Sequence, residues 1–275
     1  MDRDLDICFT HVMQLVDEVG EIIASRFFAP KENVITKTSN IDFVTETDQQ
    51  VEKHLINGIT AKFPSHKFIG EEETSEGKVA ELTNDPTWII DPVDGTLNFV
   101  HGFPHSCVSI ALLVDKVAEI GIVYNPVLNQ KFVARRGKGA TYNNRPIHVS
   151  SVTKLENALI CTETGTARDE SKMVVVMENI NKLTRLAHGI RCLGAAALNI
   201  CMVALGGADC YIEFGLHAWD MAAGELIVRE AGGVSLDPSG GPLDLMSRRC
   251  LVAATQELAN EVIAQITQYH PLPRD

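Results

Sequence analysis

The fold of this chain is decided by one stretch, Thr87-Trp88-Ile89-Ile90-Asp91-Pro92-Val93-Asp94-Gly95-Thr96, in which an apolar run ends in two acidic residues. The run predicts a short buried strand, and Pro92 and Gly95 predict a turn directly after it. Two carboxylates three residues apart on such a turn can converge on one point. Converging carboxylates repel each other unless a cation lies between them, and hard oxygen ligands favour Mg²⁺ or Ca²⁺. The stretch therefore indicates a metal site, although a solvated Asp-Gly turn explains it equally well.

Outward from this stretch, short apolar runs predict further strands. Residues 67–70 form a run that, like 87–90, leads directly into acidic residues. In the second half of the chain, strands and helices alternate. The expected strands are residues 106–114, 118–124, 131–135, 158–162 and 209–214, and the expected helices are residues 171–186, 195–205 and 219–231, with a final strand and helix after residue 249.

Two amphipathic helices are predicted before these strands. Within residues 5–23, apolar side chains recur mostly at three- and four-residue steps, so one face of this helix is apolar. A second helix is expected to begin at about Asp48 and to stop at Pro64. Thr47 followed by Gln50 fits a capping box at its start.

The order of these elements predicts the fold class. A run of strands followed by strand–helix alternation is typical of a layered α/β (α+β) protein whose sheets are covered by helices. At roughly 100–200 residues per domain, the 275 residues predict one domain, 1–275, with two halves of roughly 1–150 and 151–275 that share a core.

Composition excludes several classes of partner. With 24 Lys+Arg against 36 Asp+Glu, the net charge is -12. This acidic balance argues against a nucleic-acid binder, which needs a basic face. The longest apolar run, residues 200–205, is far shorter than the ~18–20 residues of a membrane span. The N-terminus is acidic where a secretory signal is basic, and the seven cysteines form no Cys-x-x-Cys pair. We therefore expect no nucleic acid, no membrane and a reducing, cytoplasmic location.

Two further acidic positions are candidates for the same site. Glu71 follows the strand of residues 67–70, and Asp220 lies at the start of the helix that precedes Gly232. Each has a plainer interpretation, because a Glu triplet is typical of a solvated surface and an acid in a first helical turn often interacts only with the helix dipole.

Spacing tests two other classes of site. An EF-hand loop is excluded, because the twelfth position counted from Asp91 is Gly102 and not Glu. A phosphatase with an aspartate nucleophile places its carboxylates two residues apart, and the three-residue spacing here counts against it. Gly95-Thr96 can open a helical turn whose free N–H groups would cradle a phosphate. Acidic metal ligands beside such a turn fit metal ions that bridge to the phosphate.

These segments together resemble the inositol monophosphatase family, and most closely its animal members. The resemblance covers nearly the whole chain. It rests on Gly70-Glu71-Glu72, on residues 88–99, on Trp219-Asp220-Met221-Ala222-Ala223-Gly224, on Glu230-Ala231-Gly232-Gly233, on His188-Gly189-Ile190-Arg191 and on Asp244-Leu245-Met246-Ser247-Arg248-Arg249.

The resemblance implies a layered αβαβα sandwich, a homodimer and Mg²⁺-dependent hydrolysis of phosphomonoesters that Li⁺ inhibits. It implies a first Mg²⁺ held by Glu71, Asp91 and the carbonyl of Val93. It implies a second Mg²⁺ held by Asp91, Asp94 and Asp220. The metals would lower the pKa of a water that attacks phosphorus and would stabilise the charge on the phosphate oxygens.

The resemblance also implies the remaining site residues. Thr96, Asp48 and Glu71 would be catalytic, with Thr96 and Asp48 assisting the deprotonation of the water, and no covalent intermediate would form. Glu213 would accept hydrogen bonds from the polyol, whereas without the resemblance it reads as a surface strand residue. The substrate-binding set would be Asp94, Gly95, Thr96, Gly194, Ala195, Ala196, Glu213 and Asp220. Ala195 and Leu97 depart from the hydroxyl residues of mammalian members, which concerns substrate tuning and not metal binding.

The function predicted on these grounds is hydrolysis of myo-inositol monophosphates to inositol and phosphate. One alternative is a related phosphatase that acts mainly on another sugar phosphate or on a nucleotide phosphate. Another is a catalytically silent, metal-binding scaffold. The presence of Glu71, Asp91, Asp94, Thr96 and Asp220 favours an enzyme over the scaffold.

Overall fold

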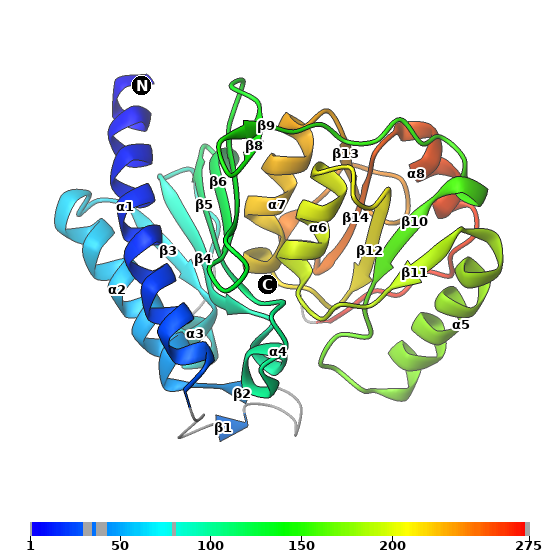
Figure 1. The fold of residues 1–275 in the computed structure, drawn as a ribbon, viewed down its shortest axis with the longest axis horizontal. Helices are drawn as coiled ribbons and strands as arrows, with labels where there is room; N and C mark the ends of the chain where they lie inside the picture. The colour runs from blue at the N-terminus through cyan, green and yellow to red at the C-terminus, as the bar shows by residue number, and fades with distance from the viewer. Residues whose placement is uncertain (1, 30–34, 37–42, 79–80, 273–275) are drawn as a thin grey trace.

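The computed structural model describes residues 2–29, 35–36, 43–78 and 81–272. It confirms the predicted layered α/β class. Figure 1 shows five layers in which a helix pair, a sheet, a second helix pair, a second sheet and a third helix pair follow one another. Among the described residues, no helix combines the length and the apolar composition that crossing a membrane requires.

The first sheet has seven strands in the order β3-β4-β5-β6-β7-β8-β9. Only the β3–β4 pair is parallel, and the remaining neighbours are antiparallel. The strands are β3 (Lys67–Gly70), β4 (Thr87–Asp94), β5 (Cys107–Val114), β6 (Val117–Asn125), β7 (Gln130–Arg135), β8 (Ala140–Tyr142) and β9 (Arg145–Pro146). A separate pair, β1 (Ile35–Thr36) and β2 (Phe43–Val44), is antiparallel.

The second sheet has five strands in the order β11-β10-β12-β14-β13. Strand β10 runs parallel to both of its neighbours, whereas β14 is antiparallel to both of its own. The strands are β10 (Leu159–Thr162), β11 (Gly189–Arg191), β12 (Cys210–Phe214), β13 (Val234–Leu236) and β14 (Arg249–Ala253).

Three pairs of helices cover the faces of these sheets. Helices α1 (Asp2–Phe27) and α2 (Glu46–Lys62) cover the outer face of the first sheet. Helices α6 (Ala196–Ala204) and α7 (Ala218–Glu230) lie between the sheets, and α5 (Glu170–Leu186) and α8 (Gln256–Ile263) cover the outer face of the second. The short elements are α3 (Glu71–Ser75), α4 (Thr96–His101), η1 (Leu155–Asn157) and η2 (Leu245–Ser247).

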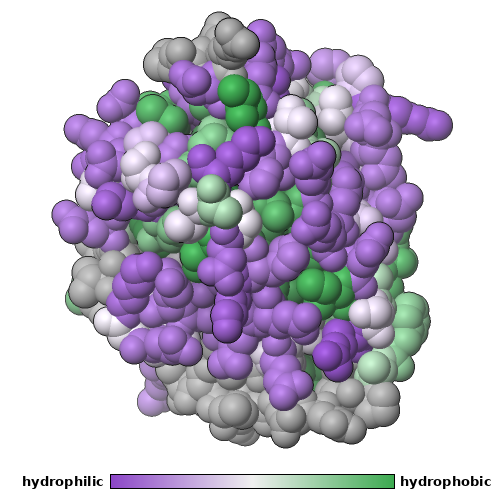
Figure 2. Space-filling model, turned by 90° about the vertical axis from the view of Figure 1, so that its left-hand side faces the viewer, coloured by the Kyte–Doolittle hydropathy of each residue, from purple (hydrophilic) through white to green (hydrophobic). Residues whose placement is uncertain are grey.

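Strand β4 is buried along its whole length because helices cover both of its faces. Side chains alternate across a strand, so Trp88 and Ile90 join the apolar cluster under α1 and α2, while Ile89 joins the cluster around α6 and α7. The solvent side of the α1–α2 layer is mostly hydrophilic, with small apolar areas (Figure 2). This is the arrangement that the three- and four-residue apolar spacing predicts.

The start of α2 and several short strands differ from the prediction, and the reasons are local. The capping box of α2 is formed by Thr45 and Asp48 and not by Thr47 and Gln50, because the chain turns helical two residues earlier. The short strands β1, β2, β8, β9, β11 and β13 were not predicted, since segments of two or three residues carry too little periodicity to recognise.

Helices α6 and α7 approach closely at Gly224. A Cβ at this position would lie only 2.6 Å from Cγ2 of Ile200 on α6. The absence of a side chain therefore allows α7 to pack against α6, and this packing fixes the direction in which the first turn of α7 points.

Candidate functional site

Three carboxylates, two of them buried, meet where the first sheet ends and α7 begins. Asp91 and Asp94 come from the end of β4, and Asp220 comes from the first turn of α7. Each offers a carboxylate oxygen within 4.8 Å of those of the other two. The pairing of β4 with β5 shifts register between Asp91 and Asp94, so a bulge containing Pro92 turns both carboxylates toward one side.

The negative charges in this cluster lie close together and raise one another's pKa values. Burial raises the pKa of Asp94 to about 8, and the charge of Asp220 adds to the rise. Burial and the charges of Glu71, Asp94 and Asp220 raise the pKa of Asp91 well above its usual range. Burial raises the pKa of Asp220 to about 6, although His217 opposes the rise. A divalent cation would allow these carboxylates to ionise together, so the donor set fits a hard metal ion.

Glu71 reaches the same cluster from a neighbouring strand. It is the first residue of α3, directly after β3, and the charge of its carboxylate contributes to the raised pKa of Asp91. Glu52 on α2 is buried and accepts 2.9 Å hydrogen bonds from the backbone N–H groups of Glu72 and Glu73. The position of Glu71 is therefore fixed by a second carboxylate beneath it.

Thr96 connects the cluster to helix α2. Its Oγ1 lies 3.2 Å from Asp48 Oδ1 and 3.0 Å from the carbonyl oxygen of Val93. The N–H of Val93 in turn donates to Asp91 Oδ1 at 3.0 Å. Asp48 is fully buried and is held by the backbone N–H and hydroxyl of Thr45. The structure thus brings Thr96, Asp48 and Val93 together with Asp91.

The turn at Gly95 brings the first sheet against the start of α6. Gly95 has a φ of 81°, and a Cβ there would lie 3.0 Å from the carbonyl oxygen of Gly194. Next to it, Asp94 accepts hydrogen bonds from the N–H groups of Ala196 at 3.2 Å and Ala197 at 2.8 Å. These contacts join residues about 100 positions apart, which no local pattern predicts.

A cavity of about 610 Å³ opens over these groups. Ten of the residues expected at the site line it: Glu71, Asp91, Val93, Asp94, Gly95, Thr96, Gly194, Ala196, Glu213 and Asp220. Asp48 lies behind Thr96, and the buried Ala195 lies against the Gly95 turn, so neither contributes to the wall.

Glu213 lines the cavity and does not lie on the outer surface of the protein. It is on β12 and only 6% exposed, so its assignment as a surface strand residue is wrong. Tyr211 donates a hydrogen bond to its Oε2. Burial raises the pKa of Glu213 to about 8, with the Tyr211 hydrogen bond and the charge of Lys172 opposing the rise.

Sequence reasoning missed two residues that shape this part of the cavity. Glu163 accepts hydrogen bonds from the N–H groups of Leu193 at 2.6 Å and Gly194 at 2.7 Å, and so holds the 193–194 turn. Lys172 on α5 is 1% exposed and lies beside Glu213. Neither belongs to a local motif, and only their contacts in the folded protein distinguish them from surface charges.

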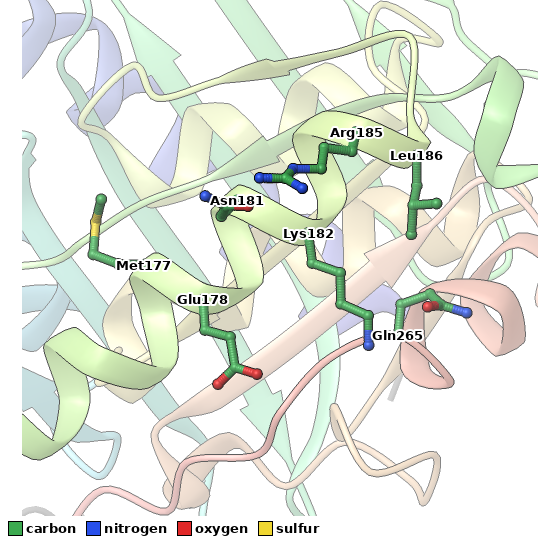
Figure 3. Close-up of a pocket in the computed structure, with 7 residues that line it drawn as sticks. All are labelled: Met177, Glu178, Asn181, Lys182, Arg185, Leu186 and Gln265. Atoms are coloured by element: carbon green, nitrogen blue, oxygen red, sulfur yellow. The ribbon is translucent and has the colours of Figure 1, made fainter.

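A second cavity, a groove on the outer face of α5, is not lined by a comparable group of converging carboxylates. Figure 3 shows residues from one side of this helix, together with Gln265 beyond α8, around a surface groove of about 690 Å³. Its charged side chains are Glu178, Lys182 and Arg185, all of them exposed. Among the described residues, the only group of carboxylates close enough to share a metal ion lies in the other cavity.

Comparisons with known proteins agree with this geometry. A model described as the inositol monophosphatase family matches residues 4–271. The chain is 46% identical over 269 residues to human inositol monophosphatase 1, covering 98% of this chain and 96% of that one. Its fold matches the extragenic suppressor protein suhB from Bartonella henselae with a TM-score of 0.85 at 30% identity, covering 94% and 98% of the two chains. It matches an inositol monophosphatase from Anabaena with a TM-score of 0.82 at 30% identity, covering 96% and 98%.

Proposed function

The chain belongs to the inositol monophosphatase family and is a phosphatase, and from this premise we propose that it hydrolyses myo-inositol monophosphates to inositol and phosphate in a Mg²⁺-dependent reaction. The observation that carries the proposal is a single cavity lined both by the acidic cluster of Asp91, Asp94 and Asp220 and by Glu213. A phosphate monoester of a polyol needs both, because its phosphate requires cations and its hydroxyl groups require acceptors.

The proposed metal ligands follow from the donor set. Glu71, Asp91 and the carbonyl of Val93 would hold one Mg²⁺, and Asp91, Asp94 and Asp220 would hold a second. Bound there, the ions would supply positive charge to the phosphate oxygens and make a nearby water more acidic. The raised pKa values of Asp91, Asp94 and Asp220 support this assignment, because they reflect burial and mutual repulsion that a bound cation would relieve.

The proposed catalytic roles fall to side chains that can move a proton. Thr96 Oγ1 contacts Asp48 Oδ1, so a water beside Thr96 could pass its proton toward a buried carboxylate. Glu71, which lines the same cavity, would accept a hydrogen bond from that water. Together the three residues would orient a water for attack on phosphorus without a covalent intermediate.

The proposed substrate contacts extend from the phosphate to the ring. Gly95 and Thr96 lie beside the acidic cluster and would contact the phosphate, and Asp94 would reach it through a bound cation. Glu213, Asp220 and the turn at residues 194–196 would contact the ring. Because Glu213 is buried, its hydrogen bonds would select strongly for a substrate with matching hydroxyls.

The test is phosphate release from a panel of phosphomonoesters with and without Mg²⁺. The panel comprises inositol 1-phosphate, other sugar phosphates, a nucleoside 2′-phosphate and phenyl phosphate. We expect turnover to require Mg²⁺ and kcat/KM to be highest for inositol 1-phosphate. A higher kcat/KM for another sugar phosphate or for the nucleotide would contradict the proposed substrate and favour the related-phosphatase alternative.

Inhibition by Li⁺ is a separate expectation of the same proposal. Li⁺ is close to Mg²⁺ in size but carries half the charge, so the oxygens of Asp91, Asp94 and Asp220 would accept it while phosphate is still bound. Inhibition should then be uncompetitive, strengthening as inositol 1-phosphate rises in steady-state assays. Inhibition that more substrate fully relieves would count against this model.

Two properties outside the active site complete the proposal. We propose a homodimer, which light scattering would test, and the exposed apolar side chains Val174 and Met177 on α5 leave surface for a partner. We also propose a cytoplasmic location, because all seven cysteines are free thiols, as a reducing compartment favours. Site residues come from both halves of the chain, which supports treating 1–275 as one functional domain.

A further inference from the structure

Lys172 is a buried cation whose ammonium group has no hydrogen-bond partner among the described residues. Its side chain is 1% exposed, and Nζ donates to none of the surrounding groups. Removing an ammonium group from water costs several kcal/mol unless an opposite charge lies nearby. The burial of the Lys172 ammonium group therefore needs a compensating charge. Its own backbone N–H is used, since it donates to Asp169 at the N-cap of α5.

The nearest compensating charge is the carboxylate that faces the cavity. A Cβ built on Gly165 would lie 2.6 Å from Lys172 Nζ and 3.1 Å from Glu213 Oε1, so both groups approach the same point beside Gly165. A Cβ on Gly215 would lie 2.9 Å from the same Nζ. The ammonium therefore lies behind two glycines that line the cavity wall, next to Glu213.

The two oxygens of Glu213 have different surroundings. Oε2 accepts a hydrogen bond from the buried hydroxyl of Tyr211, whereas no described residue donates to Oε1. Oε1 is also the oxygen near the point that Lys172 approaches. An ionised carboxylate held in this way has a free acceptor for a ligand hydroxyl, whereas a protonated one would present a donor and a weaker acceptor.

From this arrangement we propose that Lys172 is a positioning residue for substrate selectivity, whose ammonium opposes protonation of Glu213 and directs its Oε1 toward the hydroxyl groups of a polyol phosphate. The inference rests on the proposed function, because it assumes that Glu213 contacts the substrate ring. It concerns recognition and not the chemistry at phosphorus. Its consequence is that charge at position 172 changes KM for hydroxyl-bearing substrates and leaves kcat nearly unchanged.

The first experiment replaces the charge and compares two substrates. Lys172→Met, which keeps length and removes charge, should raise KM for inositol 1-phosphate about 10-fold with kcat changed less than threefold, as expected for one charge-assisted hydrogen bond. For phenyl phosphate, which has no ring hydroxyls, kcat/KM should change less than threefold. Lys172→Arg should restore most of the affinity. Lys182→Met, an exposed lysine on the same helix, is the matched control and should match the wild type on both substrates.

The second experiment tests whether Lys172 acts through Glu213. In a Glu213→Gln background, Lys172→Met should raise KM for inositol 1-phosphate less than twofold, because the carboxylate that it supports is already absent. Another 10-fold rise in that background would overturn the inference, as would equal losses on both substrates in the single variant. If Lys172→Met lowers the Tm so far that it does not fold, Lys172→Gln serves as the neutral variant and carries the same two expectations.

The two levels of proposal fail in different ways. If the wild type does not prefer inositol 1-phosphate to phenyl phosphate, the proposed function is wrong. If the wild type shows that preference and neutral variants at position 172 keep it, only the role of Lys172 is wrong.

Discussion

At the scale of single residues, the site is a set of carboxylates, most of them buried, several of which accept backbone hydrogen bonds. Asp94 shows this most clearly. It accepts hydrogen bonds from the backbone N–H groups of Ala196 and Ala197, and its carboxylate lies near those of Asp91 and Asp220. Burial raises its pKa to about 8, so without metal the protonated form is favoured at neutral pH. The backbone therefore holds Asp94 in a position that suits a cation, and ionisation of Asp94 without a metal lowers the stability of the folded protein.

Asp94→Asn is expected to separate these two effects. Because a proposed metal ligand is lost, kcat/KM should fall by at least ~100-fold at physiological Mg²⁺. This is more than the loss typical of mutating a residue that only orients a metal ligand. In EDTA, Asn cannot carry the charge that Asp94 must carry above a pKa of about 8. The Tm difference, variant minus wild type, should therefore become more positive from pH 6 to pH 9.

The measurement is a pair of thermal melts in EDTA at these two pH values, together with Mg²⁺-dependent phosphate release. Asp85→Asn, at an exposed aspartate, is the control and should show no such trend. Near wild-type turnover of Asp94→Asn at low Mg²⁺ would contradict the assignment of Asp94 as a ligand.

At the scale of elements, each functional group lies where a helix or strand begins or ends. Helix α2 is the best example, because its N-cap, Thr45, also holds Asp48, which lies 3.2 Å from Thr96. The cap of the helix and the proposed proton acceptor are therefore one hydrogen-bonded unit. Sequence reasoning placed this cap two residues late, at Thr47, since Thr45-x-x-Asp48 and Thr47-x-x-Gln50 are both acceptable local patterns.

Thr45→Ala is expected to affect both stability and rate. Loss of the N-cap should lower the free energy of unfolding by ~1 kcal/mol. Without the Thr45 hydroxyl, Asp48 is held less firmly, so kcat should fall several-fold while KM changes little. Denaturant unfolding and steady-state kinetics would measure the two effects, and Thr45→Ser, which keeps the hydroxyl, should restore both. A stable variant with unchanged kcat would show that the cap does not position Asp48.

At the scale of the whole molecule, the acidic cluster links folding to pH and to metal. Burial raises the pKa of Asp91, Asp94 and Asp220 above their usual values. The folded protein then binds more protons than the unfolded chain between about pH 4, the ordinary aspartate range, and the raised values of about 6 and about 8. Without metal, stability should therefore be greatest at the acidic end of this window and fall as pH rises through it.

Mg²⁺ should reverse this trend, because it binds the ionised carboxylates of the folded state only. Adding Mg²⁺ at about 5–10 mM, enough to occupy a weak divalent-cation site, should increase the Tm. This increase should be larger at pH 8 than at pH 5. Differential scanning fluorimetry in EDTA and in Mg²⁺ at both pH values would measure it. A larger stabilisation at pH 5 than at pH 8 would contradict the linkage.

The sequence by itself determined the features that depend on neighbouring residues. Alternation and apolar runs predicted strand β4, and the turn chemistry after it predicted that Asp91 and Asp94 would converge. The order of strands and helices predicted the layers, and motif resemblance identified the family. These features follow from local backbone geometry and side-chain periodicity, which a single chain displays directly.

Only the tertiary structure decided which distant residues share the cavity and which charges are buried. The packing of α7 on α6 places Asp220 beside β4, and the approach of α5 to β12 places Lys172 behind Glu213. Glu163 and Glu52 look like ordinary surface acids in the sequence, yet both hold backbone turns of the site. Burial and long-range contacts arise when layers close on one another, so no window of neighbouring residues contains them.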